Sequence, residues 1–120
     1  MSLGRIKTTF LDKIFSKYVR TRDNFTCQHC GKTSGLMDCA HIHSRRHVGT
    51  RWDEWNAVCL CRGCHMMFTT EPLAWAEWVK TIRTEYQLHV VAFRARSVTK
   101  FTAADRMAPR TASPADNRRR

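Results

Sequence analysis

Acidic residues are few in this chain of 120 residues, where 10 Asp and Glu stand against 21 Lys and Arg and leave a formal net charge of +11. This imbalance favours a polyanionic partner such as nucleic acid. Long apolar runs are missing too. Stretches such as Val90–Phe93 are far too short to span a bilayer, and the N-terminal MSLGRIKTTF lacks the apolar core of a signal peptide. We therefore expect a cytoplasmic protein with no membrane partner.

Proline is rare, and two of the three prolines fall in residues 108–120, which contain almost no apolar residues. We predict a disordered basic tail there. The rest of the chain is not poor in core-forming residues, since hydrophobic residues make up 42% and aromatic residues 10% of the sequence. Full disorder is thereby excluded. The length suits one domain, which we place at residues 9–107 after a flexible N-terminal arm at residues 1–8.

The six cysteines follow a pattern that favours metal binding. Two C-x-x-C pairs are separated by 30 residues, and each pair offers two thiolates to one tetrahedral zinc ion. The alternative is that these are buried or redox cysteines, but two such pairs in one small chain favour a structural Zn²⁺ site of the Cys₄ type. Its predicted ligands are Cys27, Cys30, Cys61 and Cys64. Cys39 and Cys59 have apolar neighbours and are predicted to be core residues.

The spacing of apolar residues predicts a mixed α+β fold. A helix is expected from Phe10 to Arg22 with Thr8 or Thr9 as its N-cap. Residues 36–44 are expected to form a strand, although a loop is the alternative, and residues 55–60 a second strand that leads into a short helix at 61–69. Pro72 is expected to begin a further helix whose apolar spacing continues to Tyr86, and residues 87–96 are predicted to be helical, with a strand as the alternative.

Acid/base and metal-binding side chains are concentrated between and just after the two cysteine pairs. A His follows the first predicted strand at His41, an Asn lies in the second at Asn56, and a His opens the helix nine positions later at His65. This order resembles the HNH endonucleases, also called ββα-metal nucleases. The segment NAVCLCRGCH is similar to their zinc-clipped subset. The resemblance implies a small zinc-stabilised ββα-metal domain with flanking helices.

A finer resemblance is to the phage NinG/Rap recombination nucleases. The matching pieces are C-x-x-C-G at residues 27–31, D-x-A-H at 38–41, a basic loop at 44–51, and an Asn followed by C-x-x-C at 56–64. The likeness implies a phage-encoded DNA endonuclease, working in the host cytoplasm on branched or D-loop recombination DNA. It also implies metal-dependent hydrolysis of phosphodiester bonds to 5′-phosphate and 3′-hydroxyl ends.

The resemblance also implies roles for individual residues. A neutral imidazole takes a proton near neutral pH, so His41 is expected to be the general base. Asp38 and His65 are expected to bind a catalytic Mg²⁺ or Mn²⁺, and Asn56 to orient the loop or ring of His41 through hydrogen bonds. Many family members carry an Asp or His metal ligand where this chain has Ala40. Asp38 is the expected substitute, and it would need a bend in the strand to face the same site as His41, because strand residues three apart point to opposite faces.

Other residues near this set carry open alternatives. Arg45, Arg46 and Arg51 are expected to bind DNA phosphates. His43 and His47 are expected either to face DNA or to be solvated, the tryptophans at 52 and 55 either to stack on bases or to pack in the core, and the acids at 53 and 54 either to bind metal or to form a solvated turn or helix cap. The loss of the usual ligand at Ala40 also leaves a second function open. In that alternative the chain is a catalytically inactive, zinc-stabilised DNA-binding or DNA-packaging accessory protein.

Overall fold

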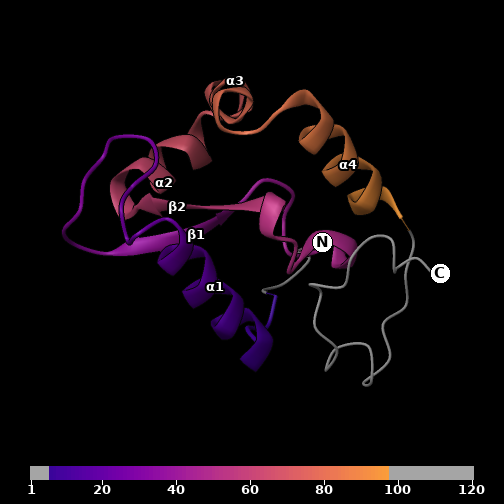
Figure 1. The fold of residues 1–120 in the computed structure, drawn as a ribbon, viewed down its shortest axis with the longest axis horizontal. Helices are drawn as coiled ribbons and strands as arrows, with labels where there is room; N and C mark the ends of the chain where they lie inside the picture. The colour runs from indigo at the N-terminus through magenta and orange to yellow at the C-terminus, as the bar shows by residue number, and fades with distance from the viewer. Residues whose placement is uncertain (1–5, 98–120) are drawn as a thin grey trace.

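The computed structural model describes residues 6–97, which form a small α+β fold with a two-stranded sheet and four α-helices (Figure 1). The antiparallel strands lie between α1 on one side and α2 on the other, and the chain then arches through α3 and α4. In chain order the elements are α1 (Phe10–Arg22), β1 (Met37–His41), the 3₁₀ turns η1 (Val48–Thr50) and η2 (Glu54–Asn56), β2 (Ala57–Cys61), α2 (Arg62–Thr70), α3 (Pro72–Ile82) and α4 (Glu85–Arg96). The predicted tail at 108–120, residues 98–107 of the predicted domain, and residues 1–5 of the predicted arm lie outside the described residues.

Helix α1 has the bounds that the apolar spacing predicts, and Thr9 is its N-cap. The Thr9 hydroxyl accepts a hydrogen bond from the backbone N–H of Asp12, while the Asp12 carboxylate accepts one from the backbone N–H of Thr9. This reciprocal pair satisfies two backbone donors that a helix start leaves without a partner. Phe15 and Val19 then face the sheet and pack with Ala57.

The two strands are shorter than predicted but pair in a regular register, with Asp38 opposite Leu60 and Cys39 opposite Cys59. The first strand ends at His41, so residues 42–44 of the predicted strand are loop. Trp55 and Asn56 were expected in the second strand and lie instead in η2. The reason is local, because the Asp53 carboxylate accepts a hydrogen bond from the backbone N–H of Trp55 and so favours a tight turn before β2 begins.

The helical spacing that continues to Tyr86 in the sequence is broken in the structure at Arg83, whose backbone is extended. Thr84 caps a new helix through a capping box with Gln87. The Arg83 guanidinium donates to the carbonyl oxygens of Trp55 and Ala57, which ties this break to the start of β2. Residues 87–96 are helical, as predicted, within α4.

The core has two parts, one on each side of the sheet. On the α2 side, Ala40, Val58, Leu60 and Phe68 pack together with partly buried side chains from α3. Of the two cysteines predicted to be core residues, Cys59 is fully buried and Cys39 is partly buried against the α1 side. Burial raises the pKa of the Cys39 thiol to about 12 and that of Cys59 to about 11, so both stay protonated near neutral pH.

None of the helices among residues 6–97 combines the length and the apolar character that crossing a membrane requires.

Candidate functional site

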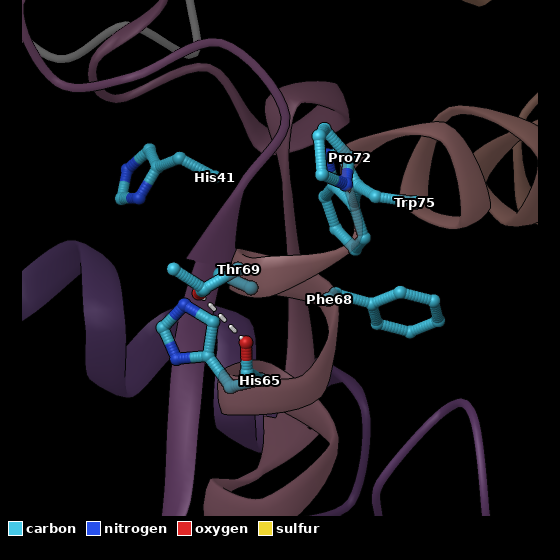
Figure 2. A pocket seen from close by; sticks show the side chains of 7 residues that line it. His41, His65, Phe68, Thr69, Pro72 and Trp75 are labelled. Atoms are coloured by element: carbon cyan, nitrogen blue, oxygen red, sulfur yellow. Dashed lines mark hydrogen bonds between the residues drawn. The ribbon is translucent and has the colours of Figure 1, made fainter.

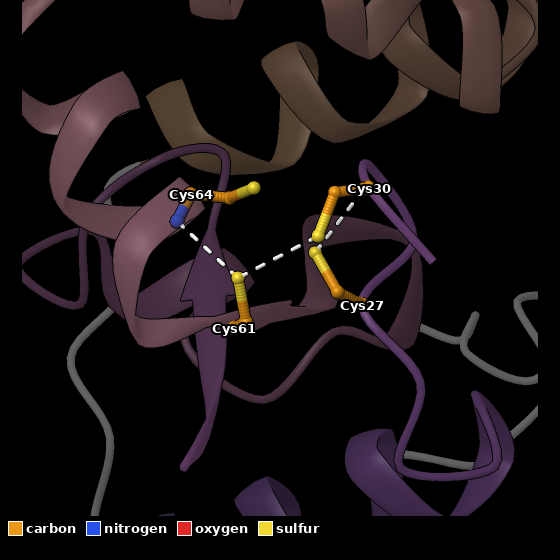
Figure 3. Close-up of side chains that lie close together, drawn as sticks. All are labelled: Cys27, Cys30, Cys61 and Cys64. Atoms are coloured by element: carbon orange, nitrogen blue, oxygen red, sulfur yellow. Dashed lines mark hydrogen bonds between the residues drawn. The ribbon is translucent and has the colours of Figure 1, made fainter. Parts of the chain in front are cut away.

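The four cysteines of the two C-x-x-C pairs converge as the spacing predicts (Figure 3). Their sulfur atoms all lie within 4.8 Å of one another, although the pairs are far apart in the sequence. Four sulfurs held about 2.3 Å from a tetrahedral zinc ion would lie about 3.8 Å apart. The Sγ atoms of Cys30 and Cys61 are separated by 3.8 Å. This donor set fits a structural zinc ion.

Backbone N–H groups approach the sulfurs in the same way in both pairs. The backbone N–H of Cys30 donates to the Sγ of Cys27, and that of Cys64 donates to the Sγ of Cys61, each at 3.4 Å. Burial acts to raise the pKa of Cys27, but hydrogen bonds from the backbone N–H groups of Cys30, Cys61 and His29 outweigh it and lower that pKa to about 6. A thiolate is the form that binds a metal ion, so the surroundings of Cys27 favour metal binding.

His41 ends β1 and is mostly buried beside Phe15 of α1, with ring centroids 5.8 Å apart. Its Nε2 lies 3.1 Å from the carbonyl oxygen of Arg51. Because a carbonyl only accepts hydrogen bonds, Nε2 carries the proton, and the lone pair of the neutral ring is then on Nδ1. Burial lowers the pKa of His41, so the ring is neutral at pH 7. A neutral imidazole fixed through one nitrogen is suited to accept a proton at the other.

Asn56 is completely buried and holds the loop that follows His41. Its side-chain oxygen accepts a hydrogen bond from the backbone N–H of His43, and its Nδ2 donates to the carbonyl oxygens of His43 and Thr50. The backbone carbonyl of Asn56 also accepts from the N–H of Ile42. Both ends of the loop that follows His41 are thus held by hydrogen bonds to one residue.

His65 lies in the first turn of α2, and the structure brings it together with Asp38 of β1. The Nδ1 of His65 is 2.9 Å from the Oδ2 of Asp38. The Arg62 guanidinium also donates to both oxygens of Asp38, at 2.8 and 2.9 Å. These contacts, Arg62 first, lower the pKa of Asp38, so the carboxylate is ionised and Nδ1 of His65 is the donor. The lone pair of a neutral His65 ring is then on Nε2.

The expected bend between Asp38 and His41 is not present, since β1 pairs with β2 in unbroken register over both residues. Asp38 and Ala40 meet α2 on one face, and Cys39 and His41 meet α1 on the other. Even so, both residues border the same open groove of about 690 Å³, which also includes His65. Asp38 and His65 fit a divalent cation only in part, because both oxygens of Asp38 already accept hydrogen bonds from Arg62. Among the described residues, the cysteine cluster is the one group of three or more metal-ligating side chains.

Two of the three arginines expected to bind phosphate also pair with a buried acid, Asp12, that the sequence reasoning missed. Arg51 donates to both Asp12 oxygens at 2.9 and 2.6 Å, and Arg45 approaches one of them at 3.4 Å. Burial acts to raise the pKa of Asp12, but the hydrogen bonds from Arg51, Thr9 and Trp52 hold it well below its usual range. Arg46 is exposed beside the groove loop. The T-x-x-D capping pattern was the only sequence signal for Asp12, and it does not indicate the arginines.

The contacts of Asp53, Trp52 and His43 bear on the alternatives that the sequence left open for these residues. Asp53 caps η2 and forms a buried ion pair with Arg94 at 2.6 Å, so it is a helix cap, although a buried one. Trp52 packs against the α1 side of the core and donates its indole N–H to Asp12. The ring of His43 lies 6.0 Å from that of His47, and burial lowers the pKa of His43.

A second, smaller hollow of about 240 Å³ adjoins this site (Figure 2). The imidazoles of His41 and His65 border it on one side, and Pro72 and Trp75 on the other. Thr69 lies next to His65, and its hydroxyl donates to the carbonyl oxygen of His65 at 2.8 Å. The two histidines therefore face both a polar groove and a largely apolar hollow.

Comparison of the chain with family models, with curated proteins and with solved structures finds no match.

Proposed function

We propose that this protein is a metal-dependent DNA endonuclease of the HNH, or ββα-metal, type. It would hydrolyse phosphodiester bonds to leave 5′-phosphate and 3′-hydroxyl ends. The observation that carries the proposal is the placement of His41, whose Nε2 is bound by the Arg51 carbonyl and whose Nδ1 is thereby the basic atom, in a groove shared with His65. The order of two antiparallel strands followed by a helix supports it as well.

His41 is the general base in this proposal. Its burial keeps the ring neutral at pH 7, and the hydrogen bond to Arg51 fixes the orientation of the ring. Nδ1 is then ready to take a proton from the attacking water. Asn56 is a positioning residue, because it holds the backbone on both sides of the loop that carries the Arg51 carbonyl.

His65 is the residue proposed to hold a catalytic Mg²⁺ or Mn²⁺, through Nε2. Asp38 orients its ring by accepting from Nδ1, an arrangement in which a carboxylate fixes a metal-binding histidine. Mg²⁺ is commonly bound by one or two carboxylates together with water and substrate phosphate, so with His65 as the protein ligand most of the coordination sphere would be water and substrate phosphate oxygens. A cation bound there would act as a Lewis acid on the phosphate and stabilise the leaving 3′ oxygen.

The charge of the chain supports DNA as the substrate. The net charge of +11 attracts a polyanion, and Arg45, Arg46 and Arg62 lie at or beside the groove. Of the three arginines expected to bind phosphate, Arg51 is the least available, because its side chain is only 14% exposed and is paired with Asp12. We propose branched recombination intermediates of a phage as the substrates, on the resemblance to the NinG/Rap nucleases.

A second candidate is an inactive DNA-binding or packaging accessory protein that keeps this fold. One observation favours it. Asp38, the residue that was to replace the missing ligand at Ala40, has both carboxylate oxygens occupied by Arg62. In this alternative the groove binds DNA phosphates and no bond is broken.

A cleavage panel separates the two candidates. The zinc-loaded protein is incubated with duplex, single-stranded, D-loop and four-way-junction DNA, each with Mg²⁺, with Mn²⁺ and without added divalent cation. If the protein is a nuclease, cleavage products with ligatable 5′ ends appear only when the divalent cation is present. A His65→Ala variant with full zinc content is then expected to give no such products. DNA binding by the wild type without any cleavage under all conditions would support the accessory protein and overturn the nuclease.

A further inference from the structure

The apolar hollow beside the two histidines has no role in the hydrolysis described above. It lies between β1, the end of α2 and the start of α3, and it is bordered by His41, His65, Thr69, Pro72 and Trp75 (Figure 2). Ala40 and Phe68 complete its lining.

The lining of the hollow consists mainly of flat rings. Trp75 is half-buried, and its indole is held from behind by Phe68 and Trp78, with ring centroids 5.2 and 5.7 Å away. Two imidazoles lie on the opposite side. Such a space favours a flat, aromatic ligand, because stacking on a fixed aromatic side chain costs little ordering of the protein.

The surroundings of the hollow show what kind of molecule brings that ligand. The neighbouring groove shares His41, His65 and Thr69 with the hollow and carries Arg45 and Arg62. A ligand that fits both spaces would place an aromatic group in the hollow and a negative charge in the groove. A nucleotide has this combination, with a phosphate next to a planar base. A volume of about 240 Å³ admits one ring system and not a base pair.

We propose that this hollow binds one unpaired DNA base, stacked on Trp75, next to the phosphate that lies in the groove. This rests on the proposed function, because it places a nucleotide of the substrate against His41 and His65. It also predicts a preference among DNA structures. The protein distinguishes DNA with an unpaired nucleotide from uniform duplex by inserting that base, and it does so by stacking with no preference for sequence.

The test measures binding, so that it does not depend on cleavage. Fluorescence anisotropy, without added divalent cation, compares the affinity of the wild type for a single strand, for a fork with an unpaired arm, and for a blunt duplex of equal length. Trp75→Ala is expected to weaken binding of the first two about tenfold, since one stacked base contributes about 1–3 kcal/mol. Affinity for the duplex is expected to change less than twofold. Leu73→Ala is the matched control, because Leu73 is on the same helix and 83% exposed.

Two further variants keep the test decisive if Trp75→Ala disturbs the core. Trp75→Phe retains a stacking ring and is expected to keep most of the affinity for unpaired DNA. Thr69→Phe replaces an exposed side chain that borders the hollow with a ring that fills it. It is expected to weaken the binding of unpaired DNA about as much as Trp75→Ala does. A single strand that carries 2-aminopurine gives a second signal, because stacking on Trp75 quenches its fluorescence.

The possible outcomes separate this inference from the proposed function. A loss of affinity in Trp75→Ala and Thr69→Phe that is confined to unpaired DNA supports the base site, even if the wild type cleaves nothing. An equal loss of affinity for paired and unpaired DNA, or unchanged affinity in Thr69→Phe, overturns the base site, even if the wild type is an active nuclease.

Discussion

The cysteine cluster and the histidine groove meet in the first turn of α2, where Cys64 and His65 are neighbours, but they differ in how their donor atoms are used. In the cluster, four sulfur atoms converge within 4.8 Å and face one another. In the groove, each imidazole has one nitrogen bound by the protein and one left over, with His41 fixed by a carbonyl and His65 by Asp38. Four sulfur ligands fill the coordination sphere of a structural zinc ion and leave no position for a substrate. An imidazole with one unbound ring nitrogen can still bind or accept a proton from another group.

The two regions also depend on different parts of the chain. The cluster is built from two local turns, each of which brings its own sulfur and backbone N–H together. The groove depends on long-range contacts, above all the buried group formed by Asp12, Arg51 and Trp52, which joins α1 to the loop after His41. A variant can therefore remove the support of the groove, and its zinc content then shows whether the cluster survives.

The largest expected effect is that of removing zinc. Binding of zinc to a Cys₄ site contributes on the order of 10 kcal/mol that is coupled to folding, which is more than a small domain has to spare. Stripping the metal with a strong chelator is expected to unfold residues 25–70, as followed by far-UV circular dichroism and hydrogen exchange. Re-addition of zinc restores the signal. A chelated protein with an unchanged spectrum would show that the cluster does not hold the domain together.

The next largest effect is expected at Asp12, which supports the groove and not the cluster. Asp12→Ala leaves Arg51 without its buried partner and should lower the free energy of unfolding by about 3–5 kcal/mol in urea titrations. The matched control is Glu77→Ala, whose exposed pair with Lys80 should contribute less than about 1 kcal/mol.

The sign of the pH dependence gives a further check on Asp12. Its folded pKa is depressed, so its stabilisation is present above its unfolded pKa of about 3.9 and is lost as the pH falls below it. The difference between wild type and Asp12→Ala should therefore shrink in acid. A difference that is constant from neutral pH to acid would contradict the ionised pair.

A smaller effect is expected for Asp38, which orients His65. Asp38→Asn keeps the shape of the side chain but removes the charge that fixes the proton on Nδ1, and a loss of about 10–100-fold in Mn²⁺ affinity is expected. Binding can be followed by electron paramagnetic resonance of Mn²⁺, without any cleavage. Arg62→Ala frees the carboxylate and serves as the comparison. A stronger loss in Arg62→Ala than in Asp38→Asn would show that Arg62, and not Asp38, supports the cation.

The smallest expected change is a shift along the pH axis. Burial lowers the pKa of His41 below its ordinary value of 6.5, so the rate of cleavage should rise with pH in acid, with the midpoint of the rise below pH 6.5. Single-turnover cleavage rates between pH 5 and 8, at saturating cation, measure this rise. A rise with its midpoint above pH 6.5 would indicate another base.

Much of the fold could be predicted because its signals are local. The capping residue Thr9 and the apolar spacing give α1 its bounds, and the two C-x-x-C pairs predict the cluster. The break at Arg83 was missed, because a helical pattern continues through it and only the Thr84 capping box opposes that pattern. Asp12 was missed because its partner Arg51 is 39 positions away, and no spacing rule links two residues that meet only in the tertiary fold.

Chemical rescue at His41 is the most direct test of its proposed role as the general base. His41→Gly removes the proposed base and leaves a space for imidazole, while the cysteine cluster, measured as zinc content, is expected to stay intact. We predict that the variant binds DNA but does not cleave it, and that added imidazole restores cleavage in proportion to its neutral fraction. Cleavage by His41→Gly at the wild-type rate without imidazole would show that His41 is not the base.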